Sequence, residues 1–225
     1  MVQPIASYNL ADEWITILLL LVVIVFGWIN VNYGKRIPRL FSAILSTRLL
    51  RQFMREEMVF SQSASLGLTG CFLCVFSLLL YEADVLFGFD LFMADGILLW
   101  ACYLLVSVLI IFSKNLSVFL VKGLIGGDFG LSEYRYTSIL AFKASGLVLL
   151  PFAVLGAFLS LSAARYAVII GGSIHVIVLI IRLLRGFSGA FGNRAPLFYI
   201  FLYLCTLEIL PLVLVFRLIA LKIGD

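Results

Sequence analysis

Apolar residues run along most of the chain in long stretches, which polar and charged residues interrupt at intervals. A transmembrane helix needs about 20 predominantly apolar residues to cross a bilayer. Six stretches qualify, at about 14–33, 64–82, 93–113, 137–160, 166–184 and 197–219. The pattern predicts an all-α polytopic membrane helical bundle with six transmembrane helices, and residues 1–225 form a single transmembrane domain.

The longest connection, between the first two predicted spans, has the periodicity of an amphipathic helix over about 38–60. Its apolar residues recur at helical spacing, and Arg48, Arg51 and Arg55 follow one another on a different face. Such a helix lies in the membrane interface with its arginines toward anionic headgroups. Two interpretations remain: a surface connector that contacts membrane lipids, and a docking helix for a partner protein.

The composition excludes a soluble domain. Hydrophobic residues make up 64% of the chain and charged residues only 12%, whereas soluble domains carry about a quarter charged residues. With a mean hydropathy of +1.18, the chain has too little polar surface to face water, so lipid must cover most of it. The net charge of +4 lies in loops and leaves no room for a folded basic domain, so no nucleic-acid partner is expected.

The basic residues predict the orientation. The first, third and fifth connections, with their edges, hold six, three and three of the 16 Lys and Arg residues, against two on the opposite side. Short loops rich in Lys and Arg stay in the cytoplasm. Both termini are therefore expected on the non-cytoplasmic side, where most acidic residues also fall, including those of an outer loop at 82–95.

Two glycine-rich segments, KGLIGGDFG at 122–130 and GFSGAFG at 186–192, resemble phosphate loops or nucleophile elbows only superficially. Neither has the strand context or the spacing that those motifs need, so both are predicted to be flexible loops. The four cysteines lie within predicted spans and are interpreted as small buried apolar residues. No catalytic residue, metal site or cofactor is predicted, and an enzyme is the less favoured class.

Four ionisable residues lie at predicted membrane depth, where charge is costly and indicates function by default. Lys143 and Arg217 lie near span ends, and we expect their long side chains to snorkel to the interface. His175 and Glu208 lie at the middle of the last two spans, with a predicted offset of ~3 Å along the helix axis. Pro211 is expected to kink the helix beside Glu208.

This predicted His175–Glu208 pair has three interpretations. It is a buried polar clasp that fixes helix packing, a proton relay or transport site, or a contact site for another subunit. Histidine titrates near neutrality, which suits a relay, whereas interhelical hydrogen bonds in membranes are worth about 1 kcal/mol and specify partners.

The closing segment FYIFLYLCTLEILPL (198–212) resembles the end of an uncharacterised family of Bacteroidota integral inner-membrane proteins. The resemblance implies a location in the bacterial inner membrane, with periplasmic termini, and assigns no activity. The leading functional hypothesis is a non-catalytic subunit or scaffold of an inner-membrane complex, in envelope biogenesis or protein export. Its partner is a membrane protein or a second copy of the chain. The alternative is a small transporter or proton-coupled channel that uses His175 and Glu208.

Overall fold

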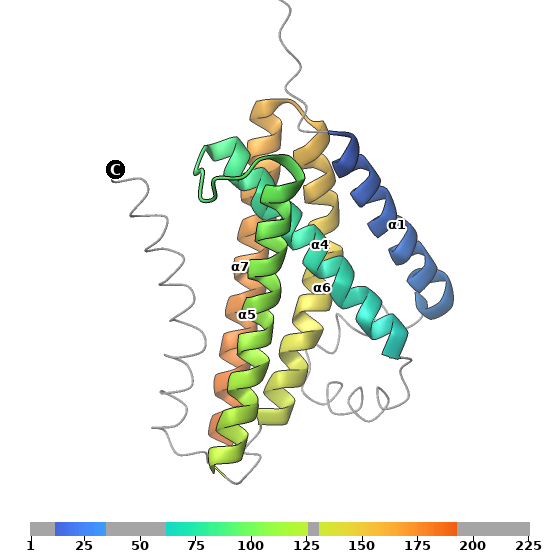
Figure 1. Ribbon diagram of the computed structural model, residues 1–225. Coiled ribbons are helices and arrows are strands. Elements are labelled where there is room, and N and C mark those ends of the chain that lie inside the picture. The colour runs from blue at the N-terminus through green and yellow to red at the C-terminus, as the bar shows by residue number, and fades with distance from the viewer. Residues whose placement is uncertain (1–11, 35–61, 126–130, 193–225) are drawn as a thin grey trace, which may run out of the picture.

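The computed structural model describes residues 12–34, 62–125 and 131–192. These residues form five helices: α1 (Glu13–Tyr33), α4 (Gln62–Phe87), α5 (Gly96–Ile125), α6 (Leu131–Phe158) and α7 (Leu161–Gly192). Successive helices run in opposite directions, so that α1, α5 and α7 begin at the upper end of the bundle in Figure 1 and α4 and α6 finish there. No strand occurs in the described ranges.

Each of the five helices is long and apolar enough to cross a membrane. The apolar segments are Glu13–Asn32, Ser65–Phe87, Gly96–Leu116, Arg135–Phe158 and Leu161–Leu184, which confirms the first five predicted spans. The predicted interfacial helix at about 38–60, with Arg48, Arg51 and Arg55, lies outside the described residues. So does the predicted sixth span at 197–219, with Glu208, Pro211 and Arg217.

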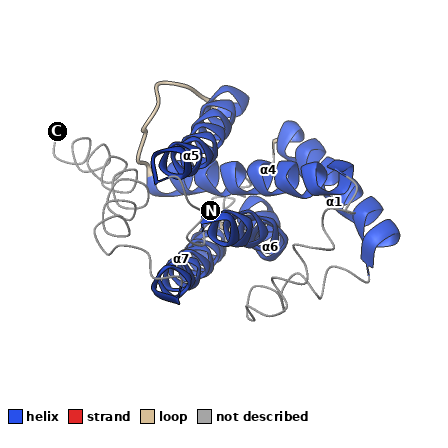
Figure 2. Ribbon diagram, turned by 90° about the horizontal axis from the view of Figure 1, so that it is seen from below, coloured by secondary structure: helices blue, strands red, loops and turns tan. Residues whose placement is uncertain are grey.

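Helices α4 and α6 form the centre of the bundle. In the most apolar stretch of α4, 56% of the residues are buried, against 17% in α5 and 22% in α1. Figure 2 shows α4 lying between α5 on one side and the α6–α7 pair on the other, with α1 packed along it. The outer helices therefore present most of their apolar surface outward, as membrane helices must toward lipid.

The α4–α6 interface is close because it is built on small residues. Gly146 of α6 lies directly against the backbone of Phe72, so that a methyl group at position 146 would be 2.8 Å from Phe72 Cα. Gly171 of α7 is packed against the side chains of Phe152 of α6 and Leu79 of α4. Small residues let membrane helices approach until van der Waals contact is made along their backbones.

Three helices continue past the C-terminal ends of their predicted spans, which corrects the loop assignments. α5 continues to Ile125, and α7 continues to Gly192, through the segment 186–192 that was predicted as a flexible loop. That prediction was wrong because glycine lowers helix propensity by only about 1 kcal/mol per residue, which an already formed helix tolerates. At about 1.5 Å per residue, the 32 residues of α7 span ~48 Å, well over a hydrocarbon core of ~30 Å.

The third extension is at the upper end of α4. The span was predicted to finish at about residue 82, whereas the helix continues to Phe87. It terminates at Gly88, which has a φ of +66° and donates from its N–H to the Asp84 carbonyl at 2.8 Å, as a left-handed C-terminal residue does. Glu82 and Asp84, expected in an outer loop, therefore lie within the last turns of α4 and are buried.

Candidate functional site

The candidate functional residues are ionisable side chains buried at different heights along the contacts between α4, α6 and α7. Four of them lie in the membrane-spanning helices, with exposed fractions of 0% for Glu82, 2% for Arg182, 3% for Lys143 and 7% for His175. Charged residues are rarely buried so completely, and in membrane proteins they mark functional positions by default. Sequence analysis selected Lys143 and His175 but missed Glu82 and Arg182.

His175 projects from α7 toward α4 and is enclosed by aromatic rings. Its imidazole lies 4.6 Å from the Phe76 ring and 6.0 Å from the Phe72 ring, measured between centroids. Within the described residues, its Nδ1 atom has no hydrogen-bond partner. The position at the middle of a span is as predicted, whereas its proposed contact with Glu208 involves a residue outside the described ranges.

The ~3 Å offset between His175 and Glu208 remains a prediction, because Glu208 lies outside the described residues. The prediction took span five to finish at about residue 184, whereas α7 is helical to Gly192.

Arg182 lies two helical turns after His175 on the same face of α7. Its guanidinium carbon is 5.1 Å from the centroid of the Phe142 ring of α6, a cation–π distance. Arg182 and Lys114 of α5 both act electrostatically on His175. Arg182 was assigned to the edge of a cytoplasmic loop, and its spacing of seven residues from His175 was the sequence signal that it shares the buried face.

Lys143 is held inside the protein. Its Nζ atom donates a hydrogen bond of 2.8 Å to Ser65 Oγ, at the start of the α4 span. The side chain points toward the lower end of the bundle, as snorkelling requires, but the residue is only 3% exposed. The ammonium is therefore hydrogen-bonded to a serine of the neighbouring helix instead of extending into water.

Removing this serine hydroxyl is expected to destabilise the fold. Ser65→Ala should lower the free energy of unfolding by about 1–3 kcal/mol, because a buried ammonium loses one acceptor. Unfolding in mixed micelles by sodium dodecyl sulfate measures this loss. Ser107→Ala is the matched control and should cost less, because the Ser107 hydroxyl donates to the Tyr103 carbonyl of its own helix. Equal losses in both variants would contradict an interhelical role for Ser65.

Glu82 is the most completely buried carboxyl in the described part of the chain. It lies on α4, and neither of its carboxyl oxygens has a hydrogen-bond partner among the described residues. Gly156 of α6 faces it so closely that an added methyl group would collide with Glu82 Oε2 and come within 3.3 Å of Val168 Cγ2. The absence of a side chain at position 156 is thus what makes room for the carboxyl.

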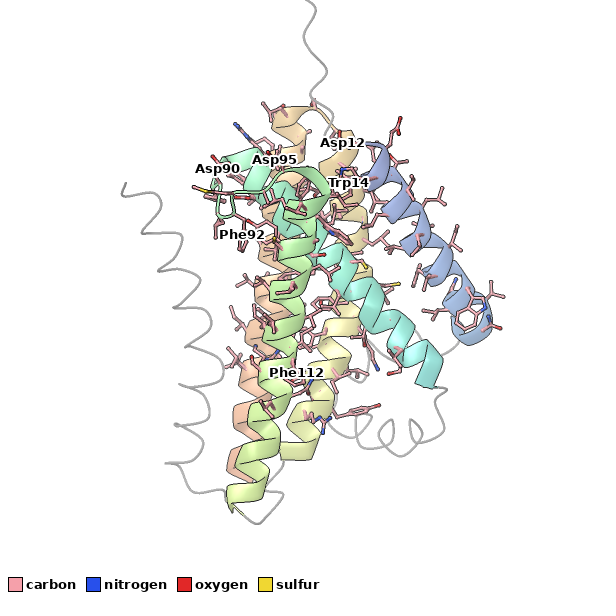
Figure 3. All side chains as sticks on the ribbon, in the orientation of Figure 1. Asp12, Trp14, Asp90, Phe92, Asp95 and Phe112 are labelled. Carbon is pink, nitrogen blue, oxygen red and sulfur yellow. The ribbon has the colours of Figure 1, made fainter. Side chains whose placement is uncertain are left out.

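Aromatic and acidic residues close the upper end of the bundle (Figure 3). Trp14 of α1 packs edge-on against Tyr81, with ring centroids 5.3 Å apart, and its indole N–H donates to Asp12 at 3.2 Å. Phe92, in the loop between α4 and α5, packs against Tyr103 at 5.3 Å. Through this contact the loop packs back onto α5.

Charge is divided between the two ends. Every carboxylate side chain that the structure describes lies toward the upper end, namely Asp12, Glu13, Glu82, Asp84, Asp90 and Asp95. Lys114, Arg135, Lys143 and Arg182 lie toward the lower end, and Arg165 is the cation of the upper end. In the described ranges, no three His, Cys, Asp or Glu side chains are grouped as a metal site requires.

Comparison with known proteins gives a family without an assigned activity. A family model for a domain of unknown function (DUF4271) matches residues 15–219, which is nearly the whole chain and covers the five described helices except the first two residues of α1. The match confirms the resemblance to an uncharacterised family that the closing segment indicates. The searches of curated proteins and of solved structures returned no match.

Proposed function

We propose a function for this chain from the premise that it belongs to the DUF4271 family, whose description supplies no reaction. The proposed function is a non-catalytic subunit or scaffold of an inner-membrane complex, with a role in envelope biogenesis or protein export. The observation that carries this proposal is the division of the bundle into a tightly packed centre and outer helices that offer broad apolar faces.

Among the described helices, α5 is the least buried. Only 17% of its most apolar stretch is buried within the bundle, although the helix contacts α4. Its outward side carries large apolar side chains that are each more than a third exposed, namely Ile97, Leu98, Leu105, Val108, Leu109, Phe112 and Leu116. A partner helix and lipid tails both suit such a face, so the test must separate the two.

The proposed arrangement in the membrane has six spans with both termini in the periplasm of a bacterium. Two observations support it: the family resemblance, and the collection of the described carboxylates at the upper end and of most described cations at the lower end. Lys and Arg near the ends of spans remain on the cytoplasmic side. A thiol introduced in the first loop by Ser46→Cys should therefore resist a membrane-impermeant maleimide in intact spheroplasts and react after permeabilisation.

Photo-cross-linking tests the subunit proposal directly. A photoreactive phenylalanine analogue in place of Leu109, which is 55% exposed on α5, should cross-link to one discrete protein in native membranes. The same analogue in place of Leu149, which is buried on α6, should give only internal products. Gentle extraction of the tagged protein should then recover that partner in stoichiometric amount. Lipid adducts alone at Leu109, with recovery of the chain by itself, would refute the proposal.

A second candidate function is a small transporter or proton-coupled channel. The observation that favours it is His175, which lies buried within a span where its Nδ1 atom has no hydrogen-bond partner among the described residues. In proteoliposomes, this candidate predicts a proton flux that His175→Gln and Glu208→Gln each abolish. A bundle that conducts nothing, or whose flux both variants retain, would exclude it.

A further inference from the structure

The carboxyl of Glu82 is buried at a position where water does not reach it to stabilise a negative charge. Glu82 lies five residues before the C-terminal end of α4, inside an apolar segment that is long enough to cross a membrane. Its exposed fraction is 0%, and neither oxygen has a hydrogen-bond partner in the part of the chain that the structure describes. An ionised carboxylate without partners is strongly disfavoured in such surroundings, which favour the neutral, protonated form of the group.

The site around Glu82 is built by three helices. The Glu82 carboxyl of α4 lies against Gly156, two residues before the end of α6, and Val168 of α7 borders the same position, 3.3 Å from where a Cβ on Gly156 would lie. A methyl group at position 156 would lie 2.9 Å from Glu82 Cδ, so the space is shaped to the carboxyl and excludes water. The fit depends on the short turn between α6 and α7, which brings the ends of both helices against α4.

Each neighbouring helix contributes few groups that can neutralise Glu82. On α7, Arg165 lies nearest the upper end, but its side chain is exposed and its Nε atom donates to the Leu86 carbonyl at 3.2 Å. On α4 itself, Asp84 accepts from the Leu91 N–H at 3.4 Å, and Tyr103 of α5 lies against Asp84. The described charges of α6, Arg135 and Lys143, lie toward the opposite end. Asp12 and Glu13 of α1 are exposed carboxylates and add only negative charge.

From this geometry we propose that Glu82 is a proton-binding site within the membrane, and that the bound proton holds the upper end of α4 against α6 and α7. When a proton binds, one carboxylate oxygen becomes a hydroxyl and the group is neutral. When it leaves, the carboxylate must reach water or a cation, which requires α4 to separate from Gly156. Proton occupancy and helix packing are therefore coupled. This inference does not rest on the proposed subunit or transport function.

A hydrophobic carbodiimide tests the site on the full-length protein in native membranes. Dicyclohexylcarbodiimide takes the proton of a neutral carboxylic acid, and the carboxylate adds to its central carbon; rearrangement leaves the whole reagent on the protein as an N-acylurea. Mass spectrometry should locate this adduct at Glu82. The rate of labelling should fall by on the order of ten-fold per pH unit once the site has lost its proton.

Matched variants assign the label and separate it from misfolding. Glu82→Gln keeps the size and neutrality of the protonated side chain, so it should remain folded and lose the adduct. Asp84→Asn, two residues away, should leave labelling unchanged, and a water-soluble carbodiimide should not modify Glu82 in the wild-type bundle. Gly156→Ala displaces the carboxyl and should make it reactive to the water-soluble reagent.

A second measurement tests whether proton binding at Glu82 is coupled to the packing of α4 against α6 and α7. A proton bound only by the closed bundle adds stability at low pH, and that stability is lost as the pH rises. The melting temperature of the wild type should therefore fall with rising pH more steeply than that of Glu82→Gln. Two results of the labelling would overturn the proposal: no adduct at Glu82 at any pH, or labelling that does not change with pH. Protection from labelling by Na⁺ or Li⁺ at constant pH would also overturn it, because it would assign a metal cation to the site.

Discussion

Replacing Phe72 by alanine is expected to lower the free energy of unfolding by about 3 kcal/mol, near the lower limit for Phe→Ala changes in protein cores. The ring is 2% exposed and packs against Phe76, Phe142 and His175, with centroids 5.5, 5.2 and 6.0 Å away. In lipid, the unfolded state keeps the side chain in apolar surroundings, so the transfer contribution is small and the lost packing remains. Unfolding by sodium dodecyl sulfate in mixed micelles measures the loss.

Phe112 provides the control for this variant. It lies in the lower half of α5 (Figure 3), with 63% of its surface exposed. Phe112→Ala should change the free energy of unfolding by about 0.5 kcal/mol or less, as surface substitutions do. If both variants lose the same amount, the position of α4 at the centre of the fold is wrong.

Replacing Gly146 by alanine is expected to cost about 1–3 kcal/mol, the usual range for overpacking a close contact. The new methyl group would lie 2.8 Å from both Cα and Cβ of Phe72 and 3.3 Å from its backbone nitrogen. Backbone atoms cannot turn aside as a side chain does, so α4 and α6 must move apart. Thermal unfolding followed by size-exclusion chromatography in detergent measures the effect.

Gly172→Ala is the matched control for the Gly146 variant. A methyl group at position 172 on α7 meets nothing within 4 Å, so it introduces no clash. Alanine is favoured over glycine in a helix by about 1 kcal/mol, so this variant should be neutral or slightly stabilising. A Gly146 variant as stable as the Gly172 variant would show that α4 and α6 are not in backbone contact.

Sequence reasoning located the spans well but placed their ends poorly. The first five spans follow from hydropathy because a helix must hide its backbone from lipid over the full thickness of the bilayer. The ends of the helices do not follow from hydropathy, since a helix continues past the apolar stretch wherever the next residues tolerate the helical conformation. Glu82 shows this: the sequence predicts it in the outer loop at 82–95, whereas it lies within α4.

The candidate site was found only in part. His175 was selected because it interrupts an apolar stretch near its middle. Lys143 was selected because it interrupts another apolar stretch more than one helical turn from its end. Arg182 and Glu82 lie near the ends of their spans, where sequence alone does not distinguish a buried charge from one that faces water. Their burial depends on how α4, α6 and α7 are rotated about their axes, which no local pattern of this chain records.

The sequence by itself determined that this protein is a membrane bundle of antiparallel helices, with its acidic residues mainly at one end. The physical reason is the lipid solvent, which requires apolar helices about 20 residues long and sorts charge along the chain. Only the tertiary structure decided that α4 and α6 lie at the centre. It also decided that Gly146 makes room for Phe72 and that Gly156 makes room for Glu82. These contacts depend on how the helix surfaces fit together, and lipid solvates those surfaces equally well in other arrangements.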